Sequence, residues 1–158
     1  MILAIDPGTT QSGWCYLESD RRVNSSGVSP NSQILNAISL AGILATADIL
    51  AIEMVASYGM PVGREVFETV RWIGRFQQAW RDPEAVRLVY RRDVKLHLCG
   101  SMKAKDANVW QSLLDKLGPV GTKKAPGPLY GVKSHARSAL AVAVCALDNP
   151  ADKIDNGL

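Results

Sequence analysis

The 158-residue sequence has few cysteines and no long apolar run. Its three cysteines, Cys15, Cys99 and Cys145, lie far apart among apolar neighbours and form no Cys-x-x-Cys pair. We expect buried thiols in a reducing cytoplasm, which excludes a disulfide framework or a paired-cysteine zinc site. No segment of about 18 apolar residues is present to span a membrane, and Asp6 comes too early for a signal peptide. The sequence therefore predicts a soluble, cytoplasmic protein with no membrane partner.

The sequence also has no internal repeat and too little length for two ordinary domains. With 47% hydrophobic residues, it can close one full core. We expect a single domain over residues 1–158. Its polar end, from about residue 148 to residue 158, has no periodicity and is predicted to be loose.

The sequence also has no strong net charge; its formal net charge is +3. This value alone does not indicate a nucleic-acid partner. The segment from Pro119 to Arg137 nevertheless contains four basic residues and no acid, whereas the last eleven residues carry three acids and one lysine. Concentrated positive charge is what a polyanion partner requires, and a solvated lysine loop is the alternative.

The apolar patterns predict an α/β layer with a mixed sheet. Strands are predicted in MILAI, SGWCYLE, DILAIEMV, AVRLVY and, more weakly, VNSSGV, with a tight turn at DPGTTQ. Helices are predicted in SPNSQILNAISLAGILATA, with Ser or Asn caps, in DANVWQSLLDKLG, and at residues 63–81 and about 133–147. The Pro- and Gly-rich GPVGTKKAPGPLYG is predicted to be a long loop.

The segment 63–81 is the clearest amphipathic helix. One side carries mostly apolar residues, namely Val66, Val70, Ile73, Gln77 and Trp80. The opposite side carries Arg64, Arg71 and Arg75. An arginine stripe is commonly only a solvated face, and phosphate binding is the other interpretation.

Two acids stand in or at the end of buried strands. Asp6 follows ILAI, and Glu53 lies inside ILAIEMV. A carboxylate in such a place is costly unless a positive charge sits on it. If the two strands are neighbours, both acids converge and favour a divalent cation. A turn-capping role for Asp6 and an edge-strand position for Glu53 are the alternatives.

His135, at the start of the last helix, is the third candidate. An imidazole serves as a metal ligand or a proton carrier, and Ser138 lies on the same helical face. A lone histidine is more often structural, so this role depends on the two acids. The other histidine, His97, has no acidic neighbour in sequence and is expected to be structural.

Taken together, these segments resemble a known family. IDPGTTQSGW, the isolated Glu in AIEMV, and SHARSALAVAV on the last helix are similar to RuvC-type Holliday junction resolvases of the RNase H-like superfamily. EMVASYGMPVGREVFETVRWIGRF, KDANVWQSLLDKLG and GPLYGV most resemble the bacteriophage branch. The resemblance covers about residues 1–147. It implies an RNase H-like five-stranded mixed sheet flanked by helices, a homodimer, and an endodeoxyribonuclease that cuts branched DNA in recombination and repair, in the host cytoplasm if phage-encoded.

The resemblance also implies a site with two Mg²⁺ or Mn²⁺ ions. Asp6 maps to an acid that bridges the ions, Glu53 to a ligand of one ion, and His135 to a residue near the ion that carries the water. Ser138 takes a position where the family has a carboxylate. One ion is therefore expected to bind weakly, unless Asp106 or another acid compensates.

DNA contacts are expected from basic residues and from a loop after the second acid. The candidates for phosphate contacts are Lys103, Lys105, Lys123, Lys124, Lys133, Arg64, Arg71 and Arg75. Tyr58 and Met60 resemble a family loop that inserts beside the junction centre, where an apolar or aromatic wedge stabilises an unstacked base. Local packing of a Gly-Pro loop is the alternative for Met60.

Two other functions compete with the nuclease. A sugar kinase or actin-like ATPase also has an Asp-x-Gly-Thr-Thr loop, but it needs two lobes, and no second Gly-rich phosphate segment follows a strand here. We therefore expect no nucleotide cofactor. A module of the same fold that binds branched DNA but cuts it poorly is the second alternative, because one acid is missing.

Overall fold

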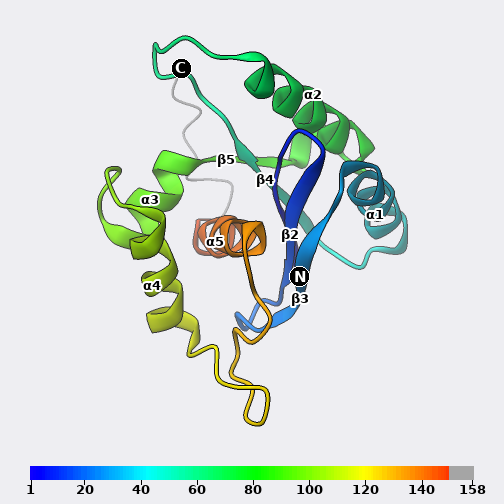
Figure 1. The fold of residues 1–158 in the computed structure, drawn as a ribbon. Coiled ribbons are helices and arrows are strands. Elements are labelled where there is room, and N and C mark those ends of the chain that lie inside the picture. The colour runs from blue at the N-terminus through cyan, green and yellow to red at the C-terminus, as the bar shows by residue number, and fades with distance from the viewer. Residues whose placement is uncertain (150–158) are drawn as a thin grey trace.

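A computed structural model of the chain describes residues 1–149, in which one sheet carries helices on both faces (Figure 1). Five strands form the sheet: β1 (Ile2–Asp6), β2 (Gln11–Leu17), β3 (Val23–Pro30), β4 (Ile49–Met54) and β5 (Arg87–Tyr90). The α-helices are α1 (Asn31–Leu44), α2 (Arg64–Ala79), α3 (Arg91–Cys99), α4 (Asp106–Leu117) and α5 (His135–Asp148). A short 3₁₀ helix, η1 (Pro83–Ala85), precedes β5. The predicted α/β class with a mixed five-stranded sheet is confirmed.

The strand order β3-β2-β1-β4-β5 brings the two predicted acids to one edge of the sheet. The first three strands pair antiparallel, whereas β1 pairs parallel with β4, and β4 with β5. Parallel strands end at the same edge, so the C-terminal ends of β1 and β4 meet. The register pairs Ile5 with Ile52, and the next residues, Asp6 and Glu53, therefore follow side by side.

The alternation of side chains places both acids on the α5 face of the sheet. Ile2 and Ala4 of β1 belong to the core that includes α5, whereas Leu3 and Ile5 belong to the core with α1 and α2. Helices α3, α4 and α5 lie on one side of the sheet, and α1 and α2 on the other (Figure 1). Asp6 continues the Ile2–Ala4 series and so points toward α5.

Helix α5 packs closely on this face, as its alanine content predicts. Nine of its residues are buried, most of them alanine or valine. Small side chains on the strands, such as Ala4 and Ala51, are buried in the same core. The start of α5 therefore lies against the sheet near the ends of β1 and β4.

The sequence prediction was incomplete in the region after β5. Helix α3 begins at Arg91, directly after Tyr90, and we expected no helix there. Its buried residues are only Val94 and Leu98. Cys99, at its end, is partly exposed rather than buried, unlike Cys15 and Cys145.

Two details of α1 and α2 also differ from the predictions. Helix α1 has Pro30 before its first turn and no side-chain cap, so the predicted Ser or Asn cap is wrong. In α2 the buried residues are Thr69, Ile73 and Phe76, and Val70 is 38% exposed. The α2 surface that faces the core is therefore rotated relative to the predicted stripe.

The end of the chain was expected to be loose from about residue 148. Asp148 is instead the last residue of α5, and its carboxylate pairs with Arg21 at 2.7 Å and with His97 at 2.8 Å. His97 thus has the structural role that we expected. Residues 150–158 lie outside the described residues, so that part of the prediction stays untested. In the described range no helix is long and apolar enough to cross a bilayer.

Candidate functional site

Asp6 ends β1, and a small polar network holds the turn that follows it. The Gly8 amide donates to the Ser12 hydroxyl at 3.2 Å, and that hydroxyl donates to the Asn31 side-chain oxygen at 2.6 Å. The Asn31 side-chain amide donates to the Gly8 carbonyl at 2.9 Å. Ser12 and Asn31 are each only 1% exposed, so these bonds form away from water. Because Ser12 and Asn31 hold the turn, Asp6 is not needed as its cap.

Gly13 allows α5 to approach Asp6. It pairs with Asp6 across the β1–β2 ladder. A Cβ atom built at Gly13 would overlap the carbonyl group of His135 and lie 2.8 Å from the His135 Cβ. Because Gly13 has no side chain, the first turn of α5 can pack directly against β2. As a result, His135 Nδ1 lies 2.9 Å from Asp6 Oδ2.

The residue before His135 has an unusual backbone. Ser134 has φ 48° and ψ −134°, a conformation that L-residues rarely adopt and that favours glycine. Non-glycine residues in such regions cost about 1–3 kcal/mol and gather at functional sites. This bend turns the chain from the loop before α5 into the helix and sets the direction in which His135 leaves it.

Glu53 lies beside Asp6 with a side chain that is only 10% exposed. Burial, followed by the negative charge of Asp6, raises the pKa of Glu53 to about 7, and the nearby Arg91 opposes this rise. Burial also raises the pKa of Asp6 above its ordinary value, while His135 offsets part of the effect. The two carboxylates thus share a poorly solvated edge of the sheet, where ionising both is unfavourable without a cation.

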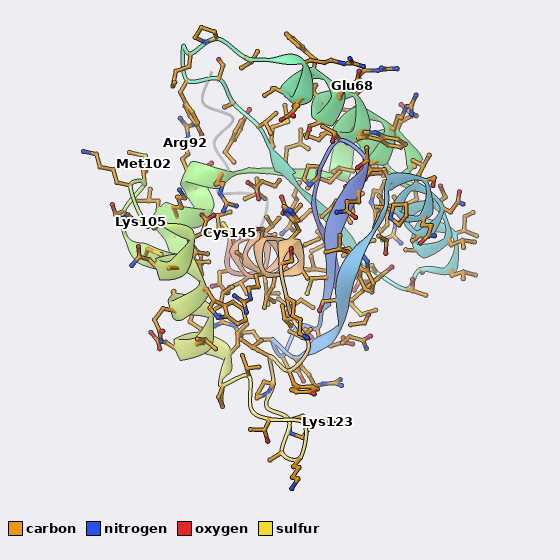
Figure 2. All side chains as sticks on the ribbon, in the orientation of Figure 1. Glu68, Arg92, Met102, Lys105, Lys123 and Cys145 are labelled. Atoms are coloured by element: carbon orange, nitrogen blue, oxygen red, sulfur yellow. The ribbon has the colours of Figure 1, made fainter. Side chains whose placement is uncertain are left out.

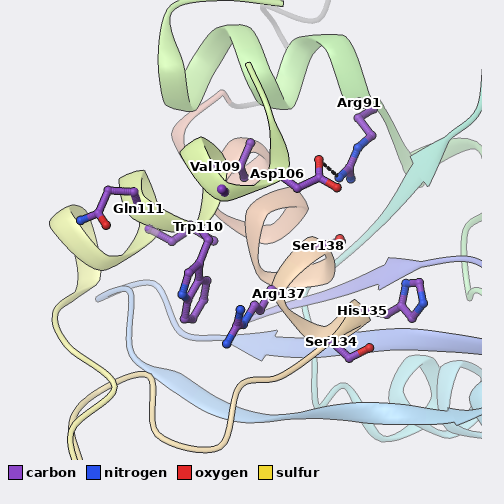
Figure 3. A pocket seen from close by; sticks show the side chains of 11 residues that line it. Arg91, Asp106, Val109, Trp110, Gln111, Ser134, His135, Arg137 and Ser138 are labelled. Carbon is purple, nitrogen blue, oxygen red and sulfur yellow. Dashed lines mark hydrogen bonds and ion pairs between the residues drawn. The ribbon is translucent and has the colours of Figure 1, made fainter. Parts of the chain in front are cut away.

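The cation that contacts Glu53 is the first residue of α3, Arg91. Its Nη1 atom lies 3.2 Å from both carboxylate oxygens of Glu53, and its Nη2 donates to Oδ1 of Asp106 at 2.6 Å. Figure 3 shows the Arg91–Asp106 pair above the start of α5. The Asp106 side chain, in the first turn of α4, is 76% exposed. One guanidinium therefore joins a buried carboxylate to an exposed one.

The donor chemistry of Asp6, Glu53 and His135 fits a divalent cation. Carboxylate oxygens suit Mg²⁺ and Mn²⁺, and imidazole is also a ligand for transition metals. Among residues 1–149, however, no group of three or more His, Cys, Asp or Glu side chains is arranged to hold an ion. Arg91 contacts both oxygens of Glu53.

A cavity of about 570 Å³ opens between α4 and the start of α5. Asp106, His135 and Ser138 line it together with Trp110 and Arg137 (Figure 3). The Arg137 guanidinium lies 4.1 Å from the centre of the Trp110 ring. An aromatic ring and a guanidinium beside the carboxylates can contact the base and phosphate of a nucleotide.

Ser138 lies near enough to Asp6 for its hydroxyl to lower the pKa of that carboxyl slightly.

A second cavity, of about 380 Å³, is lined by Glu53. Tyr58 lines it along with Arg91, Lys95 and Met102. Tyr58 is 60% exposed and has φ 49°, so the loop holds an aromatic ring outward in a strained conformation. Met60 is 71% exposed and is not among the residues that line this cavity. Tyr58, unlike Met60, thus lines a cavity that Glu53 also lines.

The predicted phosphate-binding residues are all exposed but do not form one patch. Lys103 and Lys105 lie in the α3–α4 loop, Lys123 and Lys124 at the tip of the loop before α5 (Figure 2), and Lys133 just before α5. The arginines Arg64, Arg71 and Arg75 lie on α2, which covers the opposite face of the sheet from α5. Arg71 pairs with Glu68 at 3.3 Å.

Sequence reasoning missed Arg91, Trp110 and Arg137 as parts of this region. The spacing of Val94 and Leu98 before Gly100, a left-handed helix end, indicates helix α3. That signal could have placed Arg91 at a helix start, next to the end of β5. No sequence signal pairs Arg91 with Glu53, because that contact depends on how the layers pack.

Comparison of the sequence with protein-family models and with curated proteins gives no match. Solved structures do match. A structure described as RuvC of T. thermophilus in complex with a Holliday junction substrate has a TM-score of 0.66 and 21% identity, covering 91% of this chain and 90% of that chain. A Thermus thermophilus RuvC structure has a TM-score of 0.65 and 19% identity, with 91% of both chains covered. The chain therefore has the RNase H-like fold of RuvC.

Proposed function

We propose that this protein is a structure-selective endodeoxyribonuclease that cleaves Holliday junctions and other branched DNA. One observation carries the proposal: Asp6, Glu53 and His135, remote in sequence, come from β1, β4 and α5 to a single edge of the sheet. The neighbouring RuvC structure, described as a complex with a Holliday junction substrate, supports the choice of DNA. Sequence motifs alone support a place in the phage branch, with action in the host cytoplasm.

Asp6, Glu53 and His135 would hold the Mg²⁺ or Mn²⁺ ions, two per site. When bound, such ions supply Lewis-acid stabilisation of the charge that develops at phosphorus and on the leaving oxygen. The raised pKa of Glu53, to about 7, is consistent with a carboxylate pair that requires positive charge. Ser138 can offer only a neutral oxygen, so one ion is expected to bind less tightly.

His135 can handle a proton at a defined atom. With Asp6 ionised, the 2.9 Å contact requires that Nδ1 of His135 carries the hydrogen and donates it. In the neutral imidazole the Nε2 atom then keeps one lone pair, and the side chain is 62% exposed. This lone pair serves either as an ion ligand or, when no ion is bound to it, as the acceptor of a proton from water, while Asp6 fixes the orientation of the ring.

DNA would lie across the α4–α5 side of the molecule, where the cavity beside His135 opens. Lys103, Lys105, Lys123, Lys124 and Lys133 are the proposed phosphate contacts there, and Tyr58 is the proposed wedge. The α2 arginines, on the opposite face, would require DNA that wraps around the sheet or a second subunit. A homodimer with two sites, which the resemblance implies, would make paired cuts across a junction.

Cleavage of a synthetic four-way junction tests the proposal. We expect cuts with Mg²⁺ or Mn²⁺, none with EDTA, and no cleavage by Asp6→Asn although that variant still binds the junction. The matched control is Asp115→Asn, which removes an exposed carboxylate on α4 that hydrogen-bonds Gln111. Cleavage by Asp6→Asn at the wild-type rate would contradict the proposal.

A branched-DNA-binding module that cuts poorly is the second candidate. Two observations favour it: Ser138 stands in the predicted ligand position, and Arg91 contacts both oxygens of Glu53. The same junction assay separates the two functions. A binder would retain the junction in a gel without producing cut strands at any metal concentration.

A further inference from the structure

Arg91 contacts Glu53 through the oxygens that a divalent cation would need. Its Nη1 atom lies 3.2 Å from Oε1 and 3.2 Å from Oε2, and the Glu53 side chain is only 10% exposed. A guanidinium and a divalent cation repel each other, and this repulsion is strong where water is scarce. An ion that binds Glu53 through both oxygens therefore competes with Arg91.

Asp106 is a second carboxylate partner for the Arg91 guanidinium. Its contact with Nη2, at 2.6 Å, is shorter than either contact with Glu53. Asp106 comes from α4, a different helix, and lines the cavity beside His135 together with Arg91. The Arg91 side chain is 34% exposed, so its guanidinium can shift toward Asp106 without unpacking the core.

We propose that Arg91 competes with a divalent cation for Glu53, and that Asp106 weakens this competition by holding the guanidinium from the other side. The inference rests on the proposed function, since it concerns the metal site of the nuclease. Arg91 is then a positioning residue that sets the Mg²⁺ or Mn²⁺ concentration at which Glu53 becomes available. The two helix starts, at Arg91 and Asp106, thus regulate a site whose donors lie on β1, β4 and α5.

The first test is the binding of Mn²⁺ to the full chain without DNA, measured by isothermal titration calorimetry. We expect Arg91→Gln to bind Mn²⁺ on the order of tenfold more tightly than the wild type, because the repulsion between the guanidinium and the ion is removed. Arg91→Lys keeps the charge but loses the two-sided contact, so it should bind with intermediate affinity. The control is Arg92→Gln, the same charge change one residue along, where the side chain pairs with Asp93 and not with Glu53; its affinity should be that of the wild type.

The second test concerns Asp106. Asp106→Asn should weaken Mn²⁺ binding, because Arg91 then loses its ion pair with Asp106 and keeps the one with Glu53. If Asp106 acts through Arg91, the same change should have little effect in the Arg91→Gln background. An equal loss in both backgrounds would show that Asp106 acts on the ion directly and would overturn its role in the inference.

The outcomes separate the inference from the proposed function. If the wild type binds Mn²⁺ and Arg91→Gln binds it with the same or lower affinity, the inference is wrong. The proposal of a metal-dependent nuclease is not affected by that result. Failure of every variant to bind Mn²⁺ overturns both. Circular dichroism melting reports folding, and if Arg91→Gln does not fold, Arg91→Lys and Asp106→Asn decide the question by shifting the affinity in opposite directions.

Discussion

Asp6 and His135 meet because a residue opposite Asp6 has no side chain. The turn sequence after β1 predicted that Asp6 ends a buried strand, and the isolated Glu53 in an apolar run predicted a second acid near it. Neither pattern could reveal that the start of α5 packs against Gly13, since this contact depends on how α5 lies on β2. The functional role of the acids was predictable because a buried carboxylate in an apolar strand is energetically costly. The contact between Glu53 and Arg91 was not predictable from the sequence.

Gly13→Ala should separate His135 from Asp6. The added Cβ overlaps the His135 carbonyl, so the first turn of α5 must move, and stability should fall by roughly 2 kcal/mol. Junction cleavage should decrease more than junction binding, because the lysines stay in place. Urea unfolding and a cleavage assay measure the two effects. Gly74→Ala, in open space on α2, is the control and should stabilise the protein slightly; if the two variants behave alike, the role of Gly13 is wrong.

Ser138→Asp should strengthen ion binding at the site. A carboxylate there adds negative charge beside Asp6 and His135, and ligand charge governs affinity for divalent cations. The Mg²⁺ concentration for half-maximal cleavage should fall by roughly tenfold. Ser138→Asn, of similar size but neutral, is the control. An unchanged metal requirement in Ser138→Asp would mean that Ser138 does not occupy a ligand position.

At the scale of the elements, apolar periodicity predicted most strands and helices but missed α3. This helix starts directly after β5, with no glycine or proline between them, and buries only Val94 and Leu98. Its sequence is highly charged, so the spacing of Val94 and Leu98 before Gly100 is a weak helix signal. Helix α5, in contrast, was predicted well because nine of its 14 residues are buried, most of them alanine or valine.

The bend at Ser134 belongs to the start of α5 and is itself testable. Because φ is 48° there, glycine fits this conformation better than serine, and Ser134→Gly should raise the free energy of unfolding by about 1 kcal/mol. Ser134→Ala keeps a Cβ and should give no gain. Chemical denaturation of the two variants measures the difference. A loss of stability in Ser134→Gly would show that the bend is not strained.

At the scale of the whole molecule, the site exists because β1 and β4 run parallel at the centre of the sheet. Two strands, β2 and β3, and helix α1 separate Asp6 and Glu53 in sequence, yet these acids come together at one edge of the sheet. Helix α5 covers that edge on one face. The long loop before α5 extends away from this edge and carries Lys123 at its tip (Figure 2). Basic residues on α2 face the other way, which the sequence pattern of α2 could not indicate.

The loop lysines should contribute to the salt dependence of junction binding. If Lys123 and Lys124 each neutralise one phosphate, the double change Lys123→Gln/Lys124→Gln should reduce the slope of log affinity against log salt by about 2. The control is Lys116→Gln on α4, which is not among the proposed contacts. Fluorescence anisotropy between low and moderate salt measures the slopes. Equal slopes in the wild type and the double variant would show that Lys123 and Lys124 do not contact DNA phosphates.

The central claim is that Asp6, Glu53 and His135 form one cation site at the end of β1 and β4. The most direct measurement is a crystal structure of the protein soaked in Mn²⁺, with anomalous diffraction used to locate the metal. We predict an Mn²⁺ ion in contact with the carboxylates of Asp6 and Glu53, with Arg91 turned toward Asp106. Mn²⁺ bound elsewhere, with Arg91 still on Glu53 at saturating metal, would contradict the claim.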